Sequence, residues 1–320
     1  MAITQEEHRL LYKIAQAYYT DGLTQQQIAD RFGLSRPKIS RLLKQAREEK
    51  VVTISVVPPP SGQPKLERAL EQRWDLDEAI VVTVRDPDQS GEVARDLGPA
   101  AADCFLRRLP EHAVVGLTWG RTMSALVDAL SSQSRPDVTI VQINGGLGPV
   151  DVLEHSTELA RRMAQKLSAD LRLLPAPGIV SNQAAAEALK SDKQISETLA
   201  LAARSDVVLV GLGVPRPDSV LLRDGNIVTQ QDLVRLEAAG AVGDIALRFV
   251  TASGQPVDVE MNERIIGLTL SQLRAIRLVI GVAGGTAKRE MILAALRSGL
   301  LDILITDEAT AEYVMSGVEG

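Results

Sequence analysis

The stretch TQQQIADRFGLSRPKISRLLKQA, residues 24 to 46, has the pattern of two short helices joined by a tight turn. Gly33 supplies the positive φ angle that such a turn needs. Ala29 is small enough to let the two helices touch, and Ile39 and Leu42 fall where they face back into the motif. This spacing predicts a helix-turn-helix, a motif whose second helix enters the major groove of DNA.

Start signals precede both helices. Thr24 and Gln27 have the spacing of a capping box, so the first helix can begin at Thr24. Ser35 is a favourable N-cap for the second helix, and Pro37 is tolerated in its first turn. The alternative is a helical hairpin whose basic face is only solvated. Such a hairpin would explain any one of these sequence features, but it would not explain why all of them occur together.

Polar side chains of the second helix can reach base edges and phosphates in a major groove. We expect Lys44 and either Gln25 or Gln26 to lie nearer the phosphates, and the earlier residues of the second helix to lie nearer the bases. The residues predicted to contact DNA are Thr24, Gln25, Gln26, Ser35, Arg36, Pro37, Lys38, Ser40, Arg41 and Lys44.

Composition and charge fit a DNA-binding head on a larger body. The chain has 320 residues, 45% hydrophobic and 24% charged, which is ordinary for a soluble globular protein of two domains. Residues 1 to 50 hold nine lysines and arginines against six aspartates and glutamates, a net charge of +3, whereas the whole chain carries −6. The acidic body would not adhere to DNA.

Several kinds of site and location are not expected. The single cysteine, Cys104, excludes an intrachain disulfide and lies in an apolar helical pattern. His8, His112 and His155 are scattered without metal-ligand spacing, so no metal site is expected. No apolar run reaches the roughly 18 residues of a membrane span, and the N-terminus lacks a signal-peptide core. We therefore expect a cytoplasmic protein.

A proline-rich segment, PPPSGQP, marks the boundary between two domains. We assign residues 1–57 to the helix-turn-helix domain, 58–64 to a semi-rigid linker, and 65–320 to a larger second domain. An amphipathic helix is expected over residues 4–20. The alternating run VVTISVV, residues 51–57, predicts a short strand, either a wing against DNA or a strand that closes the small domain; its lack of basic residues favours the second.

In the larger domain, short apolar strands alternate with amphipathic helices. Strands are expected at residues 78–84, 113–117, 137–143, 170–174, 206–211, 245–250, 278–282 and 303–306. Helices are expected at residues 92–109, 122–130, 157–167, 191–203, 231–238 and 286–298. This alternation is typical of an α/β fold with a doubly wound parallel sheet.

Glycine-rich turns follow four of these strands, namely LTWGRT (117–122), NGGLG (144–148), GLG (211–213) and AGGT (283–286). Ligands of open parallel sheets lie at the carboxyl ends of strands, where glycines let backbone N–H groups approach an anion. The first and last turns lead into helices that carry Arg121 and Lys288, and hydroxyls come from Thr118, Thr122 and Thr286. One such turn alone could be only a tight connection, but the set indicates a phosphorylated or other anionic ligand.

No turn matches the nucleotide-binding patterns GxGxxG or GxxxxGK[ST], so no cofactor is expected. The turns and the helix-turn-helix together resemble the SorC family (SorC/DeoR type) of bacterial transcriptional regulators of sugar metabolism. The resemblance runs along the whole chain, through IADRFGLSRPKISRLLKQAREEKVV, GLTWGRT, QINGG, LLPAPGIV, DVVLVGLG, GAVGDI and VIGVAGGTAKREMILAALRSGLLDILITDEATA.

This resemblance implies an effector and oligomerisation domain similar to sugar-phosphate isomerases and glucosamine-phosphate deaminases. It also implies tetramers or dimers of dimers on operator DNA, with a phosphorylated sugar or polyol as effector. The implied effector site comprises Thr118, Gly120, Arg121, Thr122, Asn144, Gly145, Gly211, Gly213, Asp244, Gly284, Gly285 and Lys288.

Within that site, one group would hold the phosphate from one side, namely Thr118, Gly120, Arg121 and Thr122. A second group would hold it from the other side, namely Gly284, Gly285 and Lys288. Asn144 and Gly145 would form the floor, and Gly211 and Gly213 the adjacent wall. Asp244 would either accept hydrogen bonds from sugar hydroxyls or only cap a turn.

One segment departs from the related enzymes. Where the deaminases have Gly-x-Gly-x-Asp-Gly-His, with the Asp and His as acid–base groups, this chain has GLGVPRP, with Pro215 and Pro217 at both positions. Proline cannot transfer a proton, so we expect no catalytic residues. The leading hypothesis is a repressor of a carbohydrate operon. The alternatives are a sugar-phosphate isomerase or hydrolase with an accessory DNA-binding module, and a constitutive DNA-binding protein whose second domain serves only assembly.

Overall fold

The computed structural model of the protein divides into two units, Met1–Pro59 and Pro60–Gly320. The described residues are 4–54, 62–146, 156–215, 228–257 and 260–317. Each unit has its own core, and each is described by itself below.

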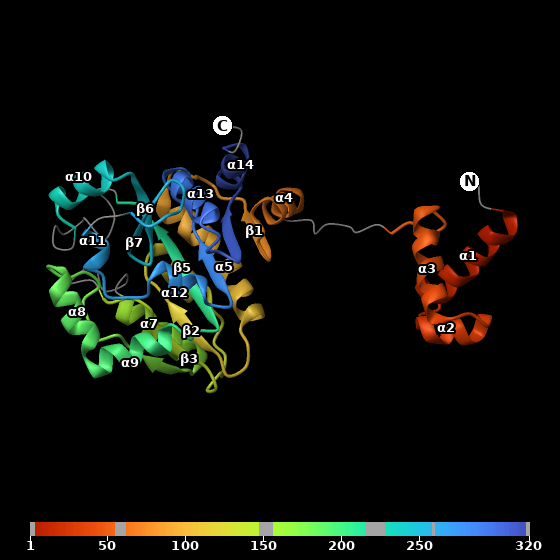
Figure 1. Ribbon diagram of the computed structural model, residues 1–320, viewed down its shortest axis with the longest axis horizontal. Helices are drawn as coiled ribbons and strands as arrows, with labels where there is room; N and C mark the ends of the chain where they lie inside the picture. The colour runs from red at the N-terminus through yellow and green to blue at the C-terminus, as the bar shows by residue number, and fades with distance from the viewer. Residues whose placement is uncertain (1–3, 55–61, 147–155, 216–227, 258–259, 318–320) are drawn as a thin grey trace. The chain divides into compact units, whose positions relative to one another are not determined.

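The first unit is a bundle of the helices α1 (Gln5–Tyr19), α2 (Gln25–Phe32) and α3 (Arg36–Glu48), seen in Figure 1. Ile14, Ile28 and Ile39 are fully buried where the three helices meet. Gly33 ends α2 in the left-handed conformation at φ 62°, as the turn requires. The predicted helix-turn-helix is therefore confirmed.

The chain after α3 differs from the prediction. Residues 51–54 form no strand, and the rest of the predicted strand, residues 55–57, lies outside the described residues. Lys50 takes a positive φ of 56°, and the N–H of Val52 donates to the carbonyl of Ala46 at 3.0 Å. Val51 and Val52 pack against α1 and the end of α3, so their apolar character serves the end of a helix.

The strands of the second unit are β1 (Glu78–Val82), β2 (Val114–Leu117), β3 (Thr139–Gln142), β4 (Asp170–Arg172), β5 (Val207–Gly213), β6 (Ala241–Ile245), β7 (Arg248–Thr251), β8 (Val279–Val282) and β9 (Ile303–Asp307). Its helices are α4 (Pro64–Trp74), α5 (Ser90–Arg108), α6 (Arg121–Ala129), α7 (Ser156–Leu167), α8 (Gln183–Ser191), α9 (Lys193–Ala202), α10 (Gln230–Ala238), α11 (Glu260–Glu263), α12 (Leu270–Arg274), the 3-10 helix η1 (Thr286–Lys288), α13 (Arg289–Arg297) and α14 (Glu308–Ser316).

Seven of these strands form a parallel sheet in the order β1-β9-β8-β5-β2-β3-β4. On one side of β2 lie β3 and then β4. On its other side lies β5, followed by β8 and β9. The strand order therefore reverses between β2 and β5. Ligands of such sheets lie beyond the carboxyl ends of the strands at this point.

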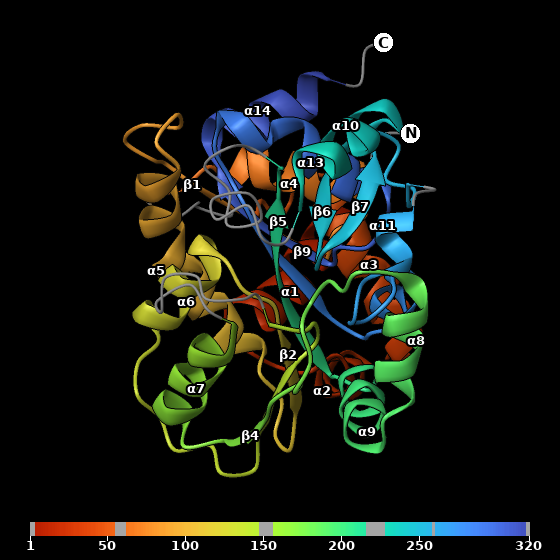
Figure 2. The same cartoon turned by 90° about the vertical axis from the view of Figure 1, so that its left-hand side faces the viewer.

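Helices cover both faces of the sheet. α5, α6 and α7 pack on one face, where Phe105 and Met123 are fully buried, and Figure 2 shows these helices grouped on one side of the strands. α4, α13 and α14 pack on the other face, where Leu70 and Met291 are fully buried. Alternate residues of β5 enter the two cores in turn, as expected for a strand buried on both sides. The predicted doubly wound α/β fold is confirmed.

The outer edge of β1 is covered by two carboxylates from α4. Glu67 accepts a hydrogen bond from the N–H of Val81 at 3.0 Å, and Glu71 accepts one from the N–H of Ala79 at 3.1 Å. Free N–H groups on an edge strand otherwise favour pairing with another chain. These bonds tie α4, the first helix after the proline-rich segment, to the sheet.

The run predicted as one strand over residues 245–250 is divided between two strands, because Ile245 ends β6, residues 246 and 247 form a bend, and Arg248 begins β7. Ala246 and Leu247 have positive φ angles of 52° and 71°. The Asp244 carboxylate accepts a hydrogen bond from the N–H of Leu247 at 2.9 Å and so closes the turn. The bend itself is buried, which is why its sequence looks like a strand. The helices α8, α11, α12 and α14 also have no counterpart in the prediction.

Candidate functional site

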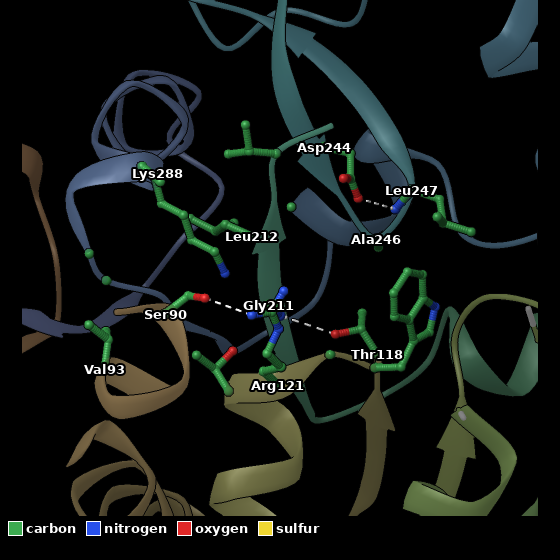
Figure 3. Close-up of a pocket in the computed structure, with 18 of the residues that line it drawn as sticks. Ser90, Val93, Thr118, Arg121, Gly211, Leu212, Asp244, Ala246, Leu247 and Lys288 are labelled. Carbon is green, nitrogen blue, oxygen red and sulfur yellow. Dashed lines mark hydrogen bonds between the residues drawn. The ribbon is translucent and has the colours of Figure 1, made fainter. Parts of the chain in front are cut away.

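A cavity lies at the carboxyl ends of β2, β5 and β8, beside the reversal of strand order. Four glycine-rich turns, the loop between β1 and α5, and the hairpin of β6 and β7 supply its walls. The structure brings together eleven of the twelve residues predicted for the effector site, all except Gly145. Figure 3 shows several of them around the cavity, with Ser90 and Asp244 on opposite sides.

Two of the turns present the starts of helices to the cavity. Gly120 (φ 126°) precedes α6, and Gly285 (φ 94°) precedes η1, which continues into α13. Neither start has a side-chain cap, in contrast to α9, where Asp192 accepts hydrogen bonds from two backbone N–H groups. Uncapped N–H groups and the positive end of a helix attract anions. The start of α6 thus offers backbone donors to an anionic ligand, whereas at the second turn the N–H groups of Gly285 and Thr286 already donate to the Asp307 carboxylate and to the Pro87 carbonyl.

The threonine hydroxyls differ in their availability. Thr118 donates to the carbonyl of Leu209 at 3.3 Å and accepts from the N–H of Gly211 at 3.1 Å, so its hydroxyl links β2 to β5. The side chain of Thr122 is buried and lines the cavity. Thr286 is exposed, and its hydroxyl donates to the carboxylate of Asp88 at 2.5 Å. Thr122 is therefore the hydroxyl best placed for a ligand.

Two cationic side chains converge on the cavity, as Figure 3 shows. Arg121, at the start of α6, donates to the hydroxyl of Ser90 at 2.6 Å. Lys288 is half-buried, and burial, followed by the charge of Arg121, lowers the pKa of its amine to about 8, although Asp244 acts in the opposite direction. Both side chains thus bring positive charge to the same end of the cavity.

Asp244 lies in the hairpin wall and is 6% exposed. Burial raises the pKa of its carboxyl to about 6, while its hydrogen bond from Leu247 and the charge of Lys288 limit the rise. Gly213 makes room for this carboxylate, because a Cβ atom at that position would collide with it. Asp244 therefore caps a turn with one oxygen and leaves the other oxygen against the cavity.

Gly145 does not line the cavity. Its N–H donates to the carbonyl of Ile266 at 2.9 Å, and a Cβ atom would collide with the carbonyl of Pro177. Glycine is required at this position because the backbone at Pro177 passes too close to leave room for a side chain.

Part of the cavity wall is formed by residues that the sequence did not predict as site residues. The loop between β1 and α5 contributes Pro87, Asp88 and Ser90, and the turn after β2 contributes Trp119. The carbonyl of Pro87 accepts a hydrogen bond from the N–H of Thr286 at 3.0 Å, which holds the loop beside the last glycine-rich turn. No glycine marks this loop, although Ser90 at the start of a long helix is a signal that could have indicated it.

The residues predicted to contact DNA lie on α2 and α3. The side chains of Arg36, Lys38 and Arg41 are exposed, whereas Ile39 between them is buried. Ser35 stands at the N-cap of α3, but its hydroxyl makes no hydrogen bond to the helix, unlike that of Thr24, which caps α2. Lys44 lies 3.7 Å from Glu48, an exposed pair of little energetic weight.

Two kinds of feature are absent from the described part of the chain. None of its helices is both long and apolar enough to cross a membrane. No group of three or more histidine, cysteine, aspartate or glutamate residues is arranged there to hold a metal ion.

Comparison with known proteins agrees with both units. Residues 59–316 match the family described as "Putative sugar-binding domain", and residues 12–49 match the family "Sigma-70, region 4". The transcriptional regulator LsrR of Enterobacter sp. (strain 638) is 33% identical over 99% of this chain and 95% of its own length. The chain belongs to the SorC/DeoR family of sugar-binding transcriptional regulators.

Other members of the SorC/DeoR family match over similar lengths. The deoxyribonucleoside regulator of Bacillus subtilis (strain 168) is 30% identical over 98% of this chain and 99% of its own length. The crystal structure of the full-length sorbitol operon regulator SorC from Klebsiella pneumoniae is 32% identical, with a TM-score of 0.73, over 98% of this chain and 100% of that one. These SorC/DeoR relatives are transcriptional regulators, not enzymes.

Proposed function

We propose that a phosphorylated sugar or polyol binds in the cavity and controls the affinity of the protein for its operator. The observation that carries the proposal is the convergence of Arg121 and Lys288 on one end of the cavity, beside the uncapped start of α6. The positive charge of Arg121 lowers the pKa of the Lys288 amine and so disfavours its charged form. A phosphate dianion between the two side chains would attract both and favour the charged form of Lys288. Residues 65–320 would then be the effector and oligomerisation domain, residues 1–57 the DNA-binding domain, and 58–64 their linker.

Each wall of the cavity has a role in this proposal. The turns 118–122 and 284–288 hold the phosphate. Gly211 lets the ligand approach β5, and Gly213 leaves room for the Asp244 carboxylate, whose free oxygen accepts a hydrogen bond from a hydroxyl of the sugar. The protein acts as a repressor of a carbohydrate operon, and the enzymatic alternative lacks support because Pro215 occupies the position of a catalytic aspartate.

A thermal-shift panel of phosphorylated sugars and polyols, with inorganic phosphate included, tests the effector class. A ligand present at 100 times its Kd stabilises the native state by about 2.7 kcal/mol. We expect one phosphorylated sugar or polyol to raise the melting temperature and to change operator binding in a gel-shift assay. Failure of every member of the panel, phosphate included, would contradict the proposal.

Effector affinity is expected to depend on pH through two groups. Lys288 has a lowered pKa of about 8, so above that pH the ligand-free protein must take up a proton to bind a dianion, and affinity falls by up to about tenfold per pH unit. Below about pH 6, Asp244 becomes protonated and the phosphate loses its second charge. Calorimetry from pH 5 to 9 should therefore show a plateau between about 6 and 8, and Lys288→Met should remove the alkaline decline.

DNA recognition is proposed to divide between base contacts and phosphate contacts on α3. Arg41→Ala is expected to weaken operator binding by about 1–3 kcal/mol if its guanidinium is bidentate to a guanine. Lys44→Ala is expected to weaken binding to all sequences alike and to flatten the salt dependence. Competition assays on operator and random DNA distinguish the two roles. Equal losses of Arg41→Ala on both DNAs would contradict base reading by that residue.

We propose that the second unit assembles the protein, as a tetramer formed by a dimer of dimers. A head of about 50 residues buries too little surface to fix two half-sites alone. Leu70 of α4 packs in the core of its own chain, so contacts by this helix would use its exposed side. A protein of residues 62–320 is expected to remain oligomeric in light scattering, and a monomer would move the dimer contact to the N-terminal helices.

A further inference from the structure

The cavity collects buried polar atoms that have no partner. Eight buried side-chain nitrogen or oxygen atoms of the described residues make no hydrogen bond, and four of them belong to residues that line this cavity. These four are Oδ1 and Nδ2 of Asn144, Nε1 of Trp119, and Oδ1 of Asp244. An unsatisfied buried polar group costs about 1–3 kcal/mol, so such a cluster indicates groups reserved for a ligand or for water.

Trp119 and Asn144 line the same cavity just beyond the ends of two neighbouring strands. β2 and β3 are parallel, with Leu117 paired to Gln142, and each of the two residues lies two positions beyond this pair. Beyond the ends of these strands Asn144 pairs with Gly267, and Trp119 lies in the turn after β2, but both side chains line the same cavity. One ligand chain can contact both side chains.

The backbone that carries Asn144 is held firmly. Asn144 forms a β-bridge with Gly267, where a side chain would collide with that of Asn144. The buried guanidinium of Arg248 donates to the carbonyls of Gly267 and Leu268, each at 2.9 Å, and to that of Asn262 at 2.6 Å. The segment that supports Asn144 is thus fixed, while its carboxamide remains without a partner. This is the arrangement of a preorganised binding group.

The unpartnered atoms differ in whether they donate or accept hydrogen bonds, and this limits the ligand groups that can pair with them. The indole of Trp119 can only donate a hydrogen bond, the ionised carboxylate of Asp244 can only accept one, and the carboxamide of Asn144 can do both. Hydroxyl groups meet all three requirements, because each donates one hydrogen bond and accepts others. A methylene group meets none of them and would leave the polar atoms buried without partners.

We infer that Asn144 and Trp119 form, with Asp244, a hydroxyl-reading end of the cavity that admits fully hydroxylated sugar or polyol phosphates and rejects phosphates whose chain lacks hydroxyls. The inference rests on the proposed function, since it presupposes that the phosphate lies at Arg121 and Lys288. Sites built to bind a hydroxyl reject analogues without it much more strongly than apolar pockets reject a change of one methylene.

The test compares matched ligands by calorimetry on the full-length protein. Sorbitol 6-phosphate, glucose 6-phosphate and ribose 5-phosphate are each compared with the alkyl phosphate of equal carbon number, hexyl or pentyl phosphate, with inorganic phosphate as reference. The best hydroxylated ligand is expected to bind at least about a hundredfold more tightly than its alkyl counterpart. Equal affinities would overturn the inference but leave the phosphate site standing. If none of these ligands bound, the proposed effector class would fail, and the inference with it.

Two variants assign the selectivity to residues. Asn144→Leu removes both polar atoms at similar volume, and Trp119→Phe removes the N–H but keeps a ring. Each is expected to lower the affinity of the best hydroxylated ligand at least about tenfold and to leave that of the alkyl phosphate unchanged, so the ratio of the two affinities falls.

Without ligand, Asn144→Leu is expected to melt no lower than the parent, because it removes unsatisfied groups. Asn182→Leu, which alters an exposed helix cap outside the cavity, should leave the affinity ratio unchanged. Equal losses for both kinds of ligand in Asn144→Leu and Trp119→Phe would show that these residues only support the fold, and would overturn the inference.

Discussion

Replacing Lys288 by methionine is expected to weaken binding of the phosphorylated effector at least tenfold, which corresponds to about 1.4 kcal/mol. The variant keeps most of the apolar stem but removes a charge that burial has already partly separated from water. A charge-assisted hydrogen bond to phosphate is about twice as strong as a neutral one, so this loss should exceed that of any single hydroxyl. Thr122→Val, which removes a buried hydroxyl at the opposite turn, should show a smaller loss in the same direction.

Calorimetry with the ligand found by thermal shift measures both losses. Operator affinity without effector should remain that of the parent, because neither residue lies in the DNA-binding unit. Lys193→Met is the matched control, since Lys193 is an exposed lysine of α9 outside the cavity, 3.9 Å from Glu197. If Lys288→Met and Thr122→Val bound the effector as tightly as the parent, the phosphate would have to lie elsewhere.

Asp307→Ala is expected to reduce the free energy of unfolding by about 3 kcal/mol and to abolish effector binding. Asp307 is fully buried at the end of β9. Its carboxylate accepts hydrogen bonds from the N–H of Gly285 at 2.6 Å, and from the hydroxyl and the N–H of Thr310 at 2.7 and 2.9 Å. The alanine variant leaves three buried donors without acceptors and releases the turn of Gly284 and Gly285.

Urea denaturation and calorimetry together check this result. Asp302→Ala provides the control, because Asp302 accepts a hydrogen bond from the N–H of Val279 at 2.6 Å at the amino ends of β8 and β9, away from the cavity. It should lose about 1 kcal/mol of stability and keep its effector affinity. An Asp307→Ala protein as stable as the parent would show that the buried carboxylate does not support the turn.

Local signals in the sequence determined the DNA-binding motif. The capping box of Thr24 and Gln27 forms as predicted, with hydrogen bonds of 2.9 and 3.3 Å, and Gly33 adopts the left-handed conformation. Each of these features depends on groups no more than a few residues apart. The sequence places such groups together whatever the rest of the chain does. The strand and helix pattern of the second unit was predictable for the same reason.

The sequence also indicated much of the cavity wall, because glycines after strands mark the carboxyl edge of a parallel sheet. It did not indicate Ser90 or Trp119. Ser90 reaches the cavity because β1 pairs with β9 at the far end of the strand order, which brings the following loop beside Thr286. That order results from packing helices on both faces of the sheet, and no residue near Ser90 encodes it.

Only the tertiary structure decided the functions of Gly145 and Asp244. Gly145 looks like part of a ligand-binding turn, yet it is required by the passing backbone of Pro177. Asp244 directly precedes the run 245–250, which has the pattern of one strand. Only the folded hairpin shows that one carboxylate oxygen accepts a hydrogen bond from Leu247 and that the other has no partner. Periodicity and caps report contacts along the chain, whereas these roles arise from segments distant in sequence that the fold brings together.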